Sequence, residues 1–434
     1  MRPDRLFIFW VAVWVVMAWV VTFRVDWQSL WGATGLVLFF VACVDWILLM
    51  RSPGVAATRR LPQSLPLGVW GEVKIRLTSR DGNAKAVQLF DHHPSSMETQ
   101  GLPLFLEVPG KGWTEVTYRL LPQTRGDQKF QQVELLLRSP LRLWRKRGFE
   151  GQSETVRVYP NFSAVAKYAL LATDNKLSQL GIRKRRRRGE GLEFHQLREY
   201  RPGDSLRQID WKATSKLHRL ISREYQDQRD QQIIFLIDCG RRMSAKDGDL
   251  SHFDHSLNSV LLLAYVALRQ GDAVGLMTFS GTPRYVAARK GASVVNVMLD
   301  ELYDLQPGMR SSDYASAATE LRKRVRKRSL VVFVTNLRDD DSAELMPVLN
   351  MLGSRHLVLV ASLREQIIDS VLKQPVNSFE DALRHAATHR YLLGRRTVHD
   401  AIAKSGAISL DVEPEYLPVA MVNRYLDLKR SGRL

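Results

Sequence analysis

Residues 232–240 read Gln232-Ile233-Ile234-Phe235-Leu236-Ile237-Asp238-Cys239-Gly240, an apolar run that stops at an acidic residue. Such a run is typical of a strand buried on both faces of a parallel sheet. Similar runs recur at Ala273–Ser280, Leu330–Leu337, His356–Leu363 and Ala407–Val412, with helical patterns at His255–Arg269, Asp313–Val325 and Phe379–Lys404 between them. This alternation predicts a doubly wound α/β domain over residues 232–434. Ligands of such folds bind at the carboxyl ends of the strands, which directs attention to Asp238, Ser280 and Thr335.

The composition is that of a globular protein with a basic surface. The chain has 434 residues, of which 45% are hydrophobic, and its formal net charge is +18. At about 150 residues per domain, two or three domains are expected. The positive charge favours contact with phosphate groups, anionic lipid or an acidic protein surface. Cys43 and Cys239 lie far apart in apolar runs, which excludes a disulfide framework and a four-thiolate zinc site and favours a cytoplasmic location for the soluble part.

Two apolar runs near the N-terminus predict a transmembrane helical hairpin over residues 1–52. They are Leu6–Phe23, which has no charged residue, and Leu30–Met50, which is interrupted only by Asp45. Each is about 27 to 31 Å long as a helix, close to the thickness of a bilayer. A signal peptide is disfavoured because no small-residue cleavage pattern follows. Arginines precede and follow the pair, so both termini are expected in the cytoplasm. Asp45 is expected to reach interfacial water or an arginine.

Residues 53–162 alternate apolar and polar side chains in short segments, such as Val73–Leu77 and Glu115–Leu120. This pattern, with turn pairs between segments, predicts a small β-sandwich-like domain. Pro140 is expected to stop the strand that contains Val133. His92 and His93 are adjacent and cannot easily share one metal ion, so a solvated loop is expected there.

Residues 163–231 are expected to form a helical linker that contains a basic run. Arg183 begins the run, which continues through Lys184, Arg185, Arg186, Arg187 and Arg188. A solvated loop and attraction to anionic lipid are the two main interpretations. Nucleic-acid binding is a further alternative, although no aromatic residue is interleaved for stacking on bases.

The linker also carries a longer pattern, GEGLEFHQLREYRPGDSLRQIDWKA, at residues 189–213. This pattern resembles the signature of the domain-of-unknown-function 58 family. Together with the hairpin, the β-rich middle and the closing segment Val422–Lys429, the resemblance covers nearly the whole chain. It implies a protein of the bacterial inner membrane, commonly encoded beside a MoxR-type AAA+ ATPase, with a proposed role in assembly or maturation. No enzyme activity is established for the family as a class.

The signature offers charges of both signs around one aromatic residue. Pro202-Gly203 suits a turn, after which Asp204 or Ser205 is expected to cap a helix. One interpretation is a salt-bridged segment that locks the linker onto the α/β domain. The other is a partner-docking surface with Trp211 as an apolar anchor. Its candidate residues are Arg198, Arg201, Asp204, Arg207, Asp210 and Trp211.

The α/β domain resembles a von Willebrand factor A domain, which holds Mg²⁺ at the carboxyl edge of its sheet. The resemblance places Asp238 as the first ligand and Ser312 at the position of a threonine ligand. Both serines expected after Asp238 are missing, and Asn336 stands where a carboxylate is expected. Because Mg²⁺ prefers hard oxygen ligands, this degenerate site is not expected to hold the ion. A cofactor is therefore not predicted.

Arg241 and Arg242 follow the first strand. One interpretation is that they are exposed loop residues. The other is that Arg242 supplies the positive charge that the metal would supply, and pairs with a carboxylate of a partner protein. His252-x-x-His255 and His385-x-x-x-His389 are expected to be ordinary residues of helix surfaces, because the glutamate of a zinc-protease helix is missing.

The sequence thus predicts a non-enzymatic scaffold or adaptor, anchored in the membrane and facing the cytoplasm. Its expected role is to dock a MoxR-type AAA+ ATPase, or the client of that ATPase, for assembly or maturation. Two alternatives from other classes stay open: binding of anionic lipid or nucleic acid through the basic run, and a metal-dependent adhesion-type receptor.

Overall fold

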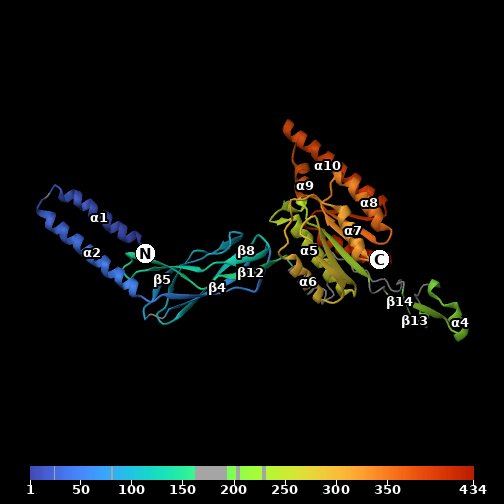
Figure 1. The fold of residues 1–434 in the computed structure, drawn as a ribbon, viewed down its shortest axis with the longest axis horizontal. Helices are drawn as coiled ribbons and strands as arrows, with labels where there is room; N and C mark the ends of the chain where they lie inside the picture. Colours follow the sequence, from blue (N-terminus) through green and yellow to red (C-terminus); the bar gives the residue numbers. More distant parts are fainter. Residues whose placement is uncertain (24, 80–81, 162–192, 202–205, 227–230) are drawn as a thin grey trace. The chain divides into compact units, whose positions relative to one another are not determined.

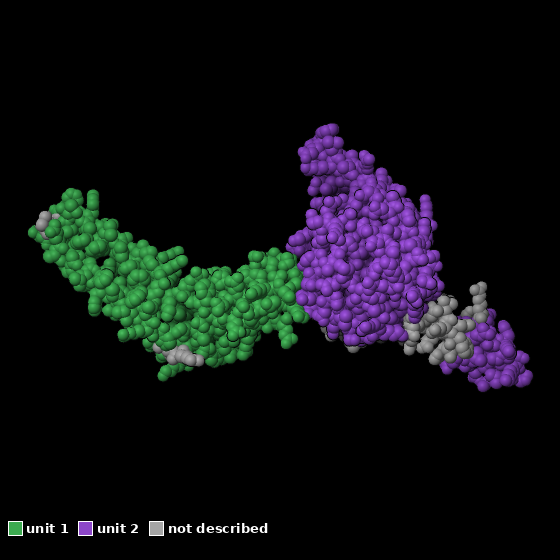
Figure 2. Space-filling view, in the orientation of Figure 1, with its two compact units in different colours: residues 1–158 green, residues 159–434 purple. Residues whose placement is uncertain are grey.

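The computed structural model describes the chain except residues 24, 80–81, 162–192, 202–205 and 227–230. The chain divides into two compact units, Met1–Val158 and Tyr159–Leu434 (Figure 2). Unit 1 contains two N-terminal helices and several β-sheets. Unit 2 contains the α/β region.

Unit 1 begins with two apolar helices, α1 (Arg5–Val21) and α2 (Gln28–Arg51), joined through the 3-10 helix η1 (Val25–Trp27). Of the described helices, α2 is long and apolar enough to cross a membrane, whereas α1, with 17 residues, is shorter. The apolar side chains of both helices are largely exposed. Such exposure is expected of a helix whose surroundings are apolar.

The remainder of unit 1 is antiparallel β structure (Figure 1). Its three sheets have the orders β1-β11-β10-β5-β7, β2-β4-β8-β6 and β3-β12-β9. The strands are β1 (Arg2–Pro3), β2 (Val55–Arg60), β3 (Ser64–Pro66), β4 (Gly71–Ser79), β5 (Lys85–Asp91), β6 (Met97–Gln100), β7 (Leu104–Val108), β8 (Trp113–Pro122), β9 (Gly126–Phe130), β10 (Val133–Arg138), β11 (Trp144–Glu150) and β12 (Glu154–Tyr159).

Strands with alternating apolar and polar side chains form this domain, as the sequence predicts. In β4 the buried side chains of Val73, Ile75 and Leu77 alternate with more exposed polar ones, because successive residues of a strand point to opposite faces. The strand β10 ends at Arg138, before Pro140, as expected of a residue that cannot donate a backbone hydrogen bond.

The turn between β10 and β11 is tied to α2 through Asp45. This carboxylate is fully buried and accepts the backbone N–H groups of Leu141 and Leu143 at 3.0 and 3.3 Å. One turn away, the indole N–H of Trp144 donates to the carbonyl of Ala42 at 2.9 Å. The expectation that Asp45 reaches water or an arginine is therefore wrong, because the turn covers it.

The start of α1 contacts the same turn. Asp4 caps α1 and donates its backbone N–H to the carbonyl of Leu143 at 2.7 Å. Its carboxylate also bonds to Arg145 and lies 3.5 Å from Arg138. Both helices are thus attached to the β domain at one level, which fixes their orientation relative to that domain.

Unit 2 contains a six-stranded sheet in the order β19-β18-β15-β20-β21-β22. All neighbouring strands are parallel except β19. They are β15 (Gln232–Asp238), β18 (Ala273–Phe279), β19 (Tyr285–Arg289), β20 (Leu330–Thr335), β21 (Leu357–Leu363) and β22 (Ile408–Val412), and β16 (Lys246–Asp247) pairs with β17 (Leu250–Ser251) beside them.

Helices cover both faces of this sheet (Figure 1). One face packs against α5 (His252–Arg269), α6 (Ser293–Leu302) and α11 (Leu417–Arg430), and the other against α7 (Tyr314–Arg324), α8 (Ser342–Gly353) and α10 (Phe379–Lys404). The short helix α9 (Gln366–Lys373) contacts α10. The strands and helices predicted for the α/β region are confirmed, because continuous apolar runs need cover on both faces.

Candidate functional site

Asp238 lies at the centre of the carboxyl edge of the sheet, at the end of β15. Its Oδ2 accepts hydrogen bonds from the hydroxyls of Ser312 at 2.5 Å and Thr335 at 2.6 Å. Its Oδ1 accepts the backbone N–H of Gly240 at 2.8 Å. The side chain is fully buried, and burial raises the pKa of Asp238 although these hydrogen bonds lower it. One carboxylate therefore joins the end of β15 to the loop before α7 and to the end of β20.

The loop after Asp238 is too tight for a side chain at Gly240. A Cβ there would lie 3.0 Å from the Asp238 carboxylate and 3.1 Å from both the Arg310 carbonyl and the Ser312 hydroxyl. The next residue donates its backbone N–H to the same Arg310 carbonyl at 2.8 Å. Glycine thus allows the loop that follows β15 to close over the carboxylate.

Arg242 forms ion pairs with acids of its own chain. It lies in the 3-10 helix η4 (Arg241–Ser244) and bonds to Asp341 and Asp340 of η5 (Asp339–Asp341). Its side chain is 19% exposed, whereas that of Asp340 is 70% exposed. Burial lowers the pKa of Arg242, but Asp341 and Asp340 raise it above its ordinary value. Arg241 is exposed, as one interpretation of the sequence expects, whereas Arg242 is not a free loop residue.

Asn336 uses both ends of its amide, which explains why a carboxylate is not found at this position. Its Nδ2 donates to Glu365 Oε1 at 2.9 Å and lies 3.3 Å from His252 Nδ1. Its Oδ1 accepts from Arg395 at 3.2 Å. An aspartate could not donate and would face the Glu365 carboxylate. Burial raises the pKa of Glu365, but hydrogen bonds from Asn336 and Tyr391 bring it below its ordinary value.

Arg395 of α10 is a buried member of this edge that the sequence did not reveal. Its side chain is 1% exposed. It donates to the Asp411 carboxylate at 2.7 Å, to the Ser362 hydroxyl at 2.8 Å and to the Leu363 carbonyl at 2.7 Å. The guanidinium therefore links α10 to the ends of two neighbouring strands. The signal that could have found it is helical spacing, because Arg395 precedes the buried Val398 and Ile402 by three and seven residues, whereas Arg396 is off this face and exposed.

His252 also departs from its expected place on a helix surface. It is fully buried, and its Nε2 lies 2.8 Å from the Asp247 carboxylate. Burial lowers the pKa of the neighbouring His255. In unit 1, His92 and His93 lie in the loop after β5 as expected and are half-buried, with His92 Nε2 2.8 Å from Glu134 Oε2 and His93 Nδ1 3.0 Å from the Pro94 carbonyl.

The residues at this edge do not fit a Mg²⁺ ion. Both oxygens of Asp238 already accept hydrogen bonds from the protein, and Asn336 is held by three other side chains. Among the described residues, no group of three or more histidine, cysteine, aspartate or glutamate side chains could hold a metal ion. The geometry brings Asp238 and Ser312 together as predicted, but as a hydrogen-bonded pair.

The described part of the signature forms a small module of its own. The strands β13 (Glu193–Glu199) and β14 (Ile221–Gln226) pair, and η3 (Leu206–Gln208), which contains Arg207, and α4 (Trp211–Leu217) lie between them in sequence. Asp210 accepts the backbone N–H of Ala213 and the Nε of Arg223, both at 2.9 Å. These two bonds lower its pKa.

The other signature candidates lie on the surface of this module or outside the described residues. Arg198 donates to the carbonyl of its neighbour Glu199 at 3.0 Å, and Arg201 is exposed. Trp211 is 68% exposed, so it is not buried as an anchor within the described chain. Asp204 and the basic run from Lys184 to Arg188 lie outside the described residues. The helix cap expected of Asp204 or Ser205 is provided for α4 by Asp210.

Comparison with known proteins finds distant relatives. Uncharacterized proteins of Mycobacterium bovis and Mycobacterium tuberculosis are each 22% identical over 262 residues, which cover 57% of this chain and 82% of the relative.

Among solved structures, an aerotolerance-related membrane protein from Bacteroides fragilis is similar at 12% identity and a TM-score of 0.31, over 46% of this chain and 99% of that one. Salmonella alpha-2-macroglobulin is similar at 11% identity and a TM-score of 0.20, over 24% of this chain and 7% of that one. Scores this low carry no argument about the fold. In sequence, residues 196–384 match the family described as "Protein of unknown function DUF58".

Proposed function

We propose that this protein is a non-enzymatic scaffold or adaptor, anchored in the bacterial inner membrane. In this proposal α1 and α2 form a two-span hairpin with both termini in the cytoplasm. The α/β region acts as a von Willebrand factor A-like domain that docks a MoxR-type AAA+ ATPase or its client. The long apolar helix α2 supports the anchor, and the positive-inside rule supports its orientation.

The observation that carries the proposal is the internally satisfied edge around Asp238. Hydrogen bonds from Gly240, Ser312 and Thr335 join two loops and the end of β20 there, so the edge holds its shape without an ion. An edge whose loops are already hydrogen-bonded in the free protein is suited to recognition of another protein, because little ordering is needed on binding.

Charged and polar groups surround this edge on the outside. Arg242 and Asp340 present an ion pair of which only the acid is well exposed. A pocket of about 890 Å³ lies beside Ser280, Arg284, Arg310 and Asp313. We expect the partner to offer a cation to Asp340 and to compete for Arg242 with a carboxylate, so that recognition depends on both signs of charge.

The test is a pull-down from membrane fractions with identification of the bound proteins. Wild type is expected to recover an AAA+ ATPase, and Arg242→Glu is expected to lose it. The matched control is Arg355→Glu, which changes an exposed arginine just before β21, at the opposite edge of the sheet. The control should bind as wild type does.

A charge swap separates recognition from folding. Arg242→Glu combined with Asp340→Arg and Asp341→Arg restores both internal ion pairs in reverse. If Arg242 serves only the fold, the swap recovers binding, and if the partner reads these charges, binding stays lost. Recovery of wild-type binding by the swap would argue against the proposal, as would recovery that requires Mg²⁺. Binding of DNA or lipid that falls steeply with salt and ignores Arg242 would favour the basic run instead.

A further inference from the structure

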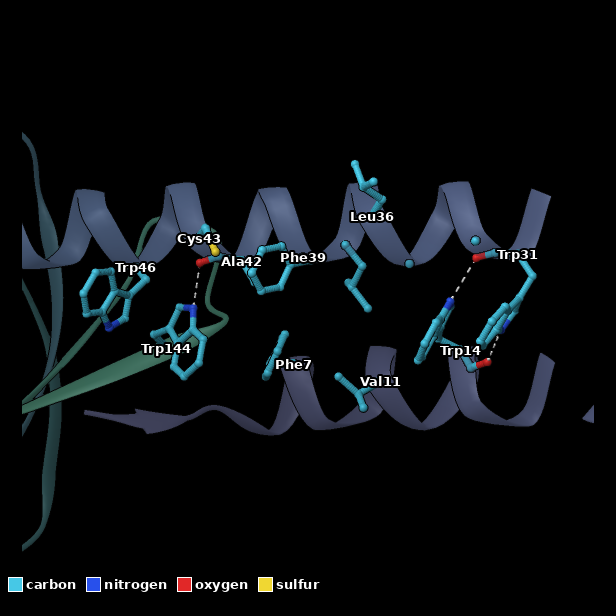
Figure 3. Close-up of a pocket in the computed structure, with 13 residues that line it drawn as sticks. Phe7, Val11, Trp14, Trp31, Leu36, Phe39, Ala42, Cys43, Trp46 and Trp144 are labelled. Carbon is cyan, nitrogen blue, oxygen red and sulfur yellow. Dashed lines mark hydrogen bonds between the residues drawn. The ribbon is translucent and has the colours of Figure 1, made fainter. Parts of the chain in front are cut away.

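A deep apolar groove runs between α1 and α2 within unit 1 (Figure 3). Its volume is about 650 Å³, which is within the range of pockets that hold small organic molecules. The two helices and β11 all contribute to its wall, through side chains that include Phe7, Val11, Trp14, Trp31, Leu36 and Trp144. The wall is almost entirely apolar, so its occupant must be apolar along most of its length.

The far end of the groove is closed by two stacked tryptophans. The rings of Trp14 and Trp31 lie 4.4 Å apart between centroids. Each indole N–H donates to the backbone carbonyl of the other residue, at 3.2 and 3.1 Å. These reciprocal bonds satisfy the polar atoms of both rings and hold the helices together. The groove is therefore preformed.

The near end of the groove lies where the helices join the β domain. Trp144 lines the groove and bonds to Ala42 of α2 (Figure 3). In the β1–β11 pair, Pro3 is opposite Trp144 and Arg2 is opposite Arg145. The turn that precedes Trp144 contains Arg142, between the two residues that bond to Asp45. Trp144 therefore lines the near end of the groove, and Arg2 and Arg142 lie close to Trp144 in the β1–β11 pair and in the preceding turn.

The arginines near this end of the groove outnumber the acidic residues that could neutralise them. Asp4 bonds to Arg145 and lies near Arg138. Arg2, Arg5 and Arg142 are exposed and have no salt bridge with any residue in the part of the chain that the structure describes. Arginines without an acid near the end of an apolar groove favour a ligand that is anionic at one end and apolar over the rest.

We propose that this groove binds an anionic phospholipid, with an acyl chain between α1 and α2 and its phosphate at Arg2 and Arg142. The site rests on the proposed membrane anchor. From Gln28 to Asp45, α2 is about 26 Å long, and α1 is about 25 Å long, so the groove lies at the depth of acyl chains and the arginines at the depth of headgroups. A zwitterionic lipid binds less well because its ammonium opposes the arginines. This site shares no residue with the basic run.

The test uses tryptophan fluorescence of the full chain in phosphatidylcholine vesicles. A minor fraction of the lipid carries brominated acyl chains, either as phosphatidylglycerol or as phosphatidylcholine. Bromine quenches tryptophan on contact, and four tryptophans line the groove. Brominated phosphatidylglycerol should quench more strongly. Arg2→Gln and Arg142→Gln should each reduce its preference about fivefold, the effect of one basic residue at a membrane surface.

A groove-filling variant tests the position of the chain. A Cβ at Gly32 meets no atom within 4 Å, so Gly32→Leu can occupy the groove without a clash. It should remove the additional quenching by phosphatidylglycerol. Ala33→Leu is the matched control, because Ala33 adjoins Gly32 on α2 but does not line the groove. The control should behave as wild type.

Equal quenching by the two lipids in wild type would overturn the lipid site. Unchanged quenching in Gly32→Leu would do the same, and crosslinking between copies that this variant alone abolishes would assign the groove to a second copy. Extraction by alkaline carbonate separates the two proposals. Release of the wild-type protein would remove the membrane anchor itself, whereas a retained protein without lipid preference would lose only the lipid site.

Discussion

The two units each bury an aspartate that joins separate segments, but the two carboxylates are satisfied by different donors. Asp45 in unit 1 accepts two backbone N–H groups of one turn. Asp238 in unit 2 accepts two side-chain hydroxyls and one N–H group. Backbone donors cannot turn to new acceptors, whereas hydroxyls can rotate. Asp45 is therefore a fixed joint between helix and sheet, and Asp238 is an adjustable one at the edge where such folds bind ligands.

Asp45→Ala should cause the largest loss of stability in this comparison. It removes the acceptor of the N–H groups of exposed Leu141 and buried Leu143, which should lower the free energy needed to open the turn by about 3 kcal/mol. Tryptic cleavage after Arg142, which lies in that turn, measures its opening in the full chain in detergent. The cleavage rate should rise about 150-fold if it follows the open population.

The control for this change is Asp26→Ala, which removes an exposed acid from η1. It should leave the cleavage rate unchanged. Asp45→Asn retains one acceptor oxygen and should give an intermediate rate. A cleavage rate for Asp45→Ala within about twofold of wild type would mean that Asp45 does not hold the turn.

Asn336→Asp should cause the next largest loss, in unit 2. The new carboxylate would face Glu365 and could not donate to it, at a cost of about 2 kcal/mol. The readout is labelling of the buried thiol of Cys239, in a Cys43→Ser background, during urea unfolding. Mg²⁺ should not restore the stability. Restoration by Mg²⁺ would show that one amide is all that separates this edge from a metal site.

Asp238→Ala should cost less than Asp45→Ala, about 1 to 2 kcal/mol by the same thiol labelling. The Ser312 and Thr335 hydroxyls can find other acceptors, and Thr335 already lies 3.2 Å from the hydroxyl of Tyr314. Removal of a buried charge also offsets part of the loss. A cost equal to that of Asp45→Ala would refute the distinction between fixed and adjustable joints.

The pH dependence of stability tests the same comparison, and its expected effect is smaller. Burial raises the pKa of Asp238 above its ordinary value of 3.8. The unfolded chain thus releases this proton at lower pH than the folded chain does, so the contribution of Asp238 to stability falls as pH rises from 3.8 through the folded pKa. Asp238→Asn cannot titrate. The ratio of thiol-labelling rates, wild type over variant, should therefore increase over that range, and a flat ratio would contradict the raised pKa.

The sequence could predict the α/β sheet because each buried strand corresponds to a continuous run of apolar residues. It could also bring Asp238 and Thr335 to one edge, because parallel strands end together, whereas Ser312 was expected there only from the resemblance to a von Willebrand factor A domain. It could not predict the acids that pair with Arg242, which lie 98 and 99 residues away. Arg395 was missed although its spacing from Val398 and Ile402 places it on the buried face of α10, because arginine is rarely buried unless paired and its acid, Asp411, lies on a separate strand.

The helical part of unit 1 likewise contains one feature that local sequence predicts and one that depends on residues far away in the chain. Apolar length alone predicted α2, but Asp45 looked like an acid at the edge of a bilayer. Its donors come from a turn 96 and 98 residues downstream, and no periodicity connects the two segments. An acidic residue within an apolar run did indicate that Asp45 has a special role. That role is to join α2 to the β-sheet.

Trp211→Ala should have the smallest effect on stability, within about 0.5 kcal/mol, because the side chain is 68% exposed and leaves no cavity. The same change should weaken recovery of the AAA+ ATPase if the signature module contributes to docking, since an exposed aromatic residue loses contact area only when a partner covers it. The matched control is Leu217→Ala, which removes another exposed apolar side chain from the same helix. Lower stability in Trp211→Ala would instead mean that the module packs on its own chain, and unchanged stability with unchanged recovery would confine docking to the edge around Arg242.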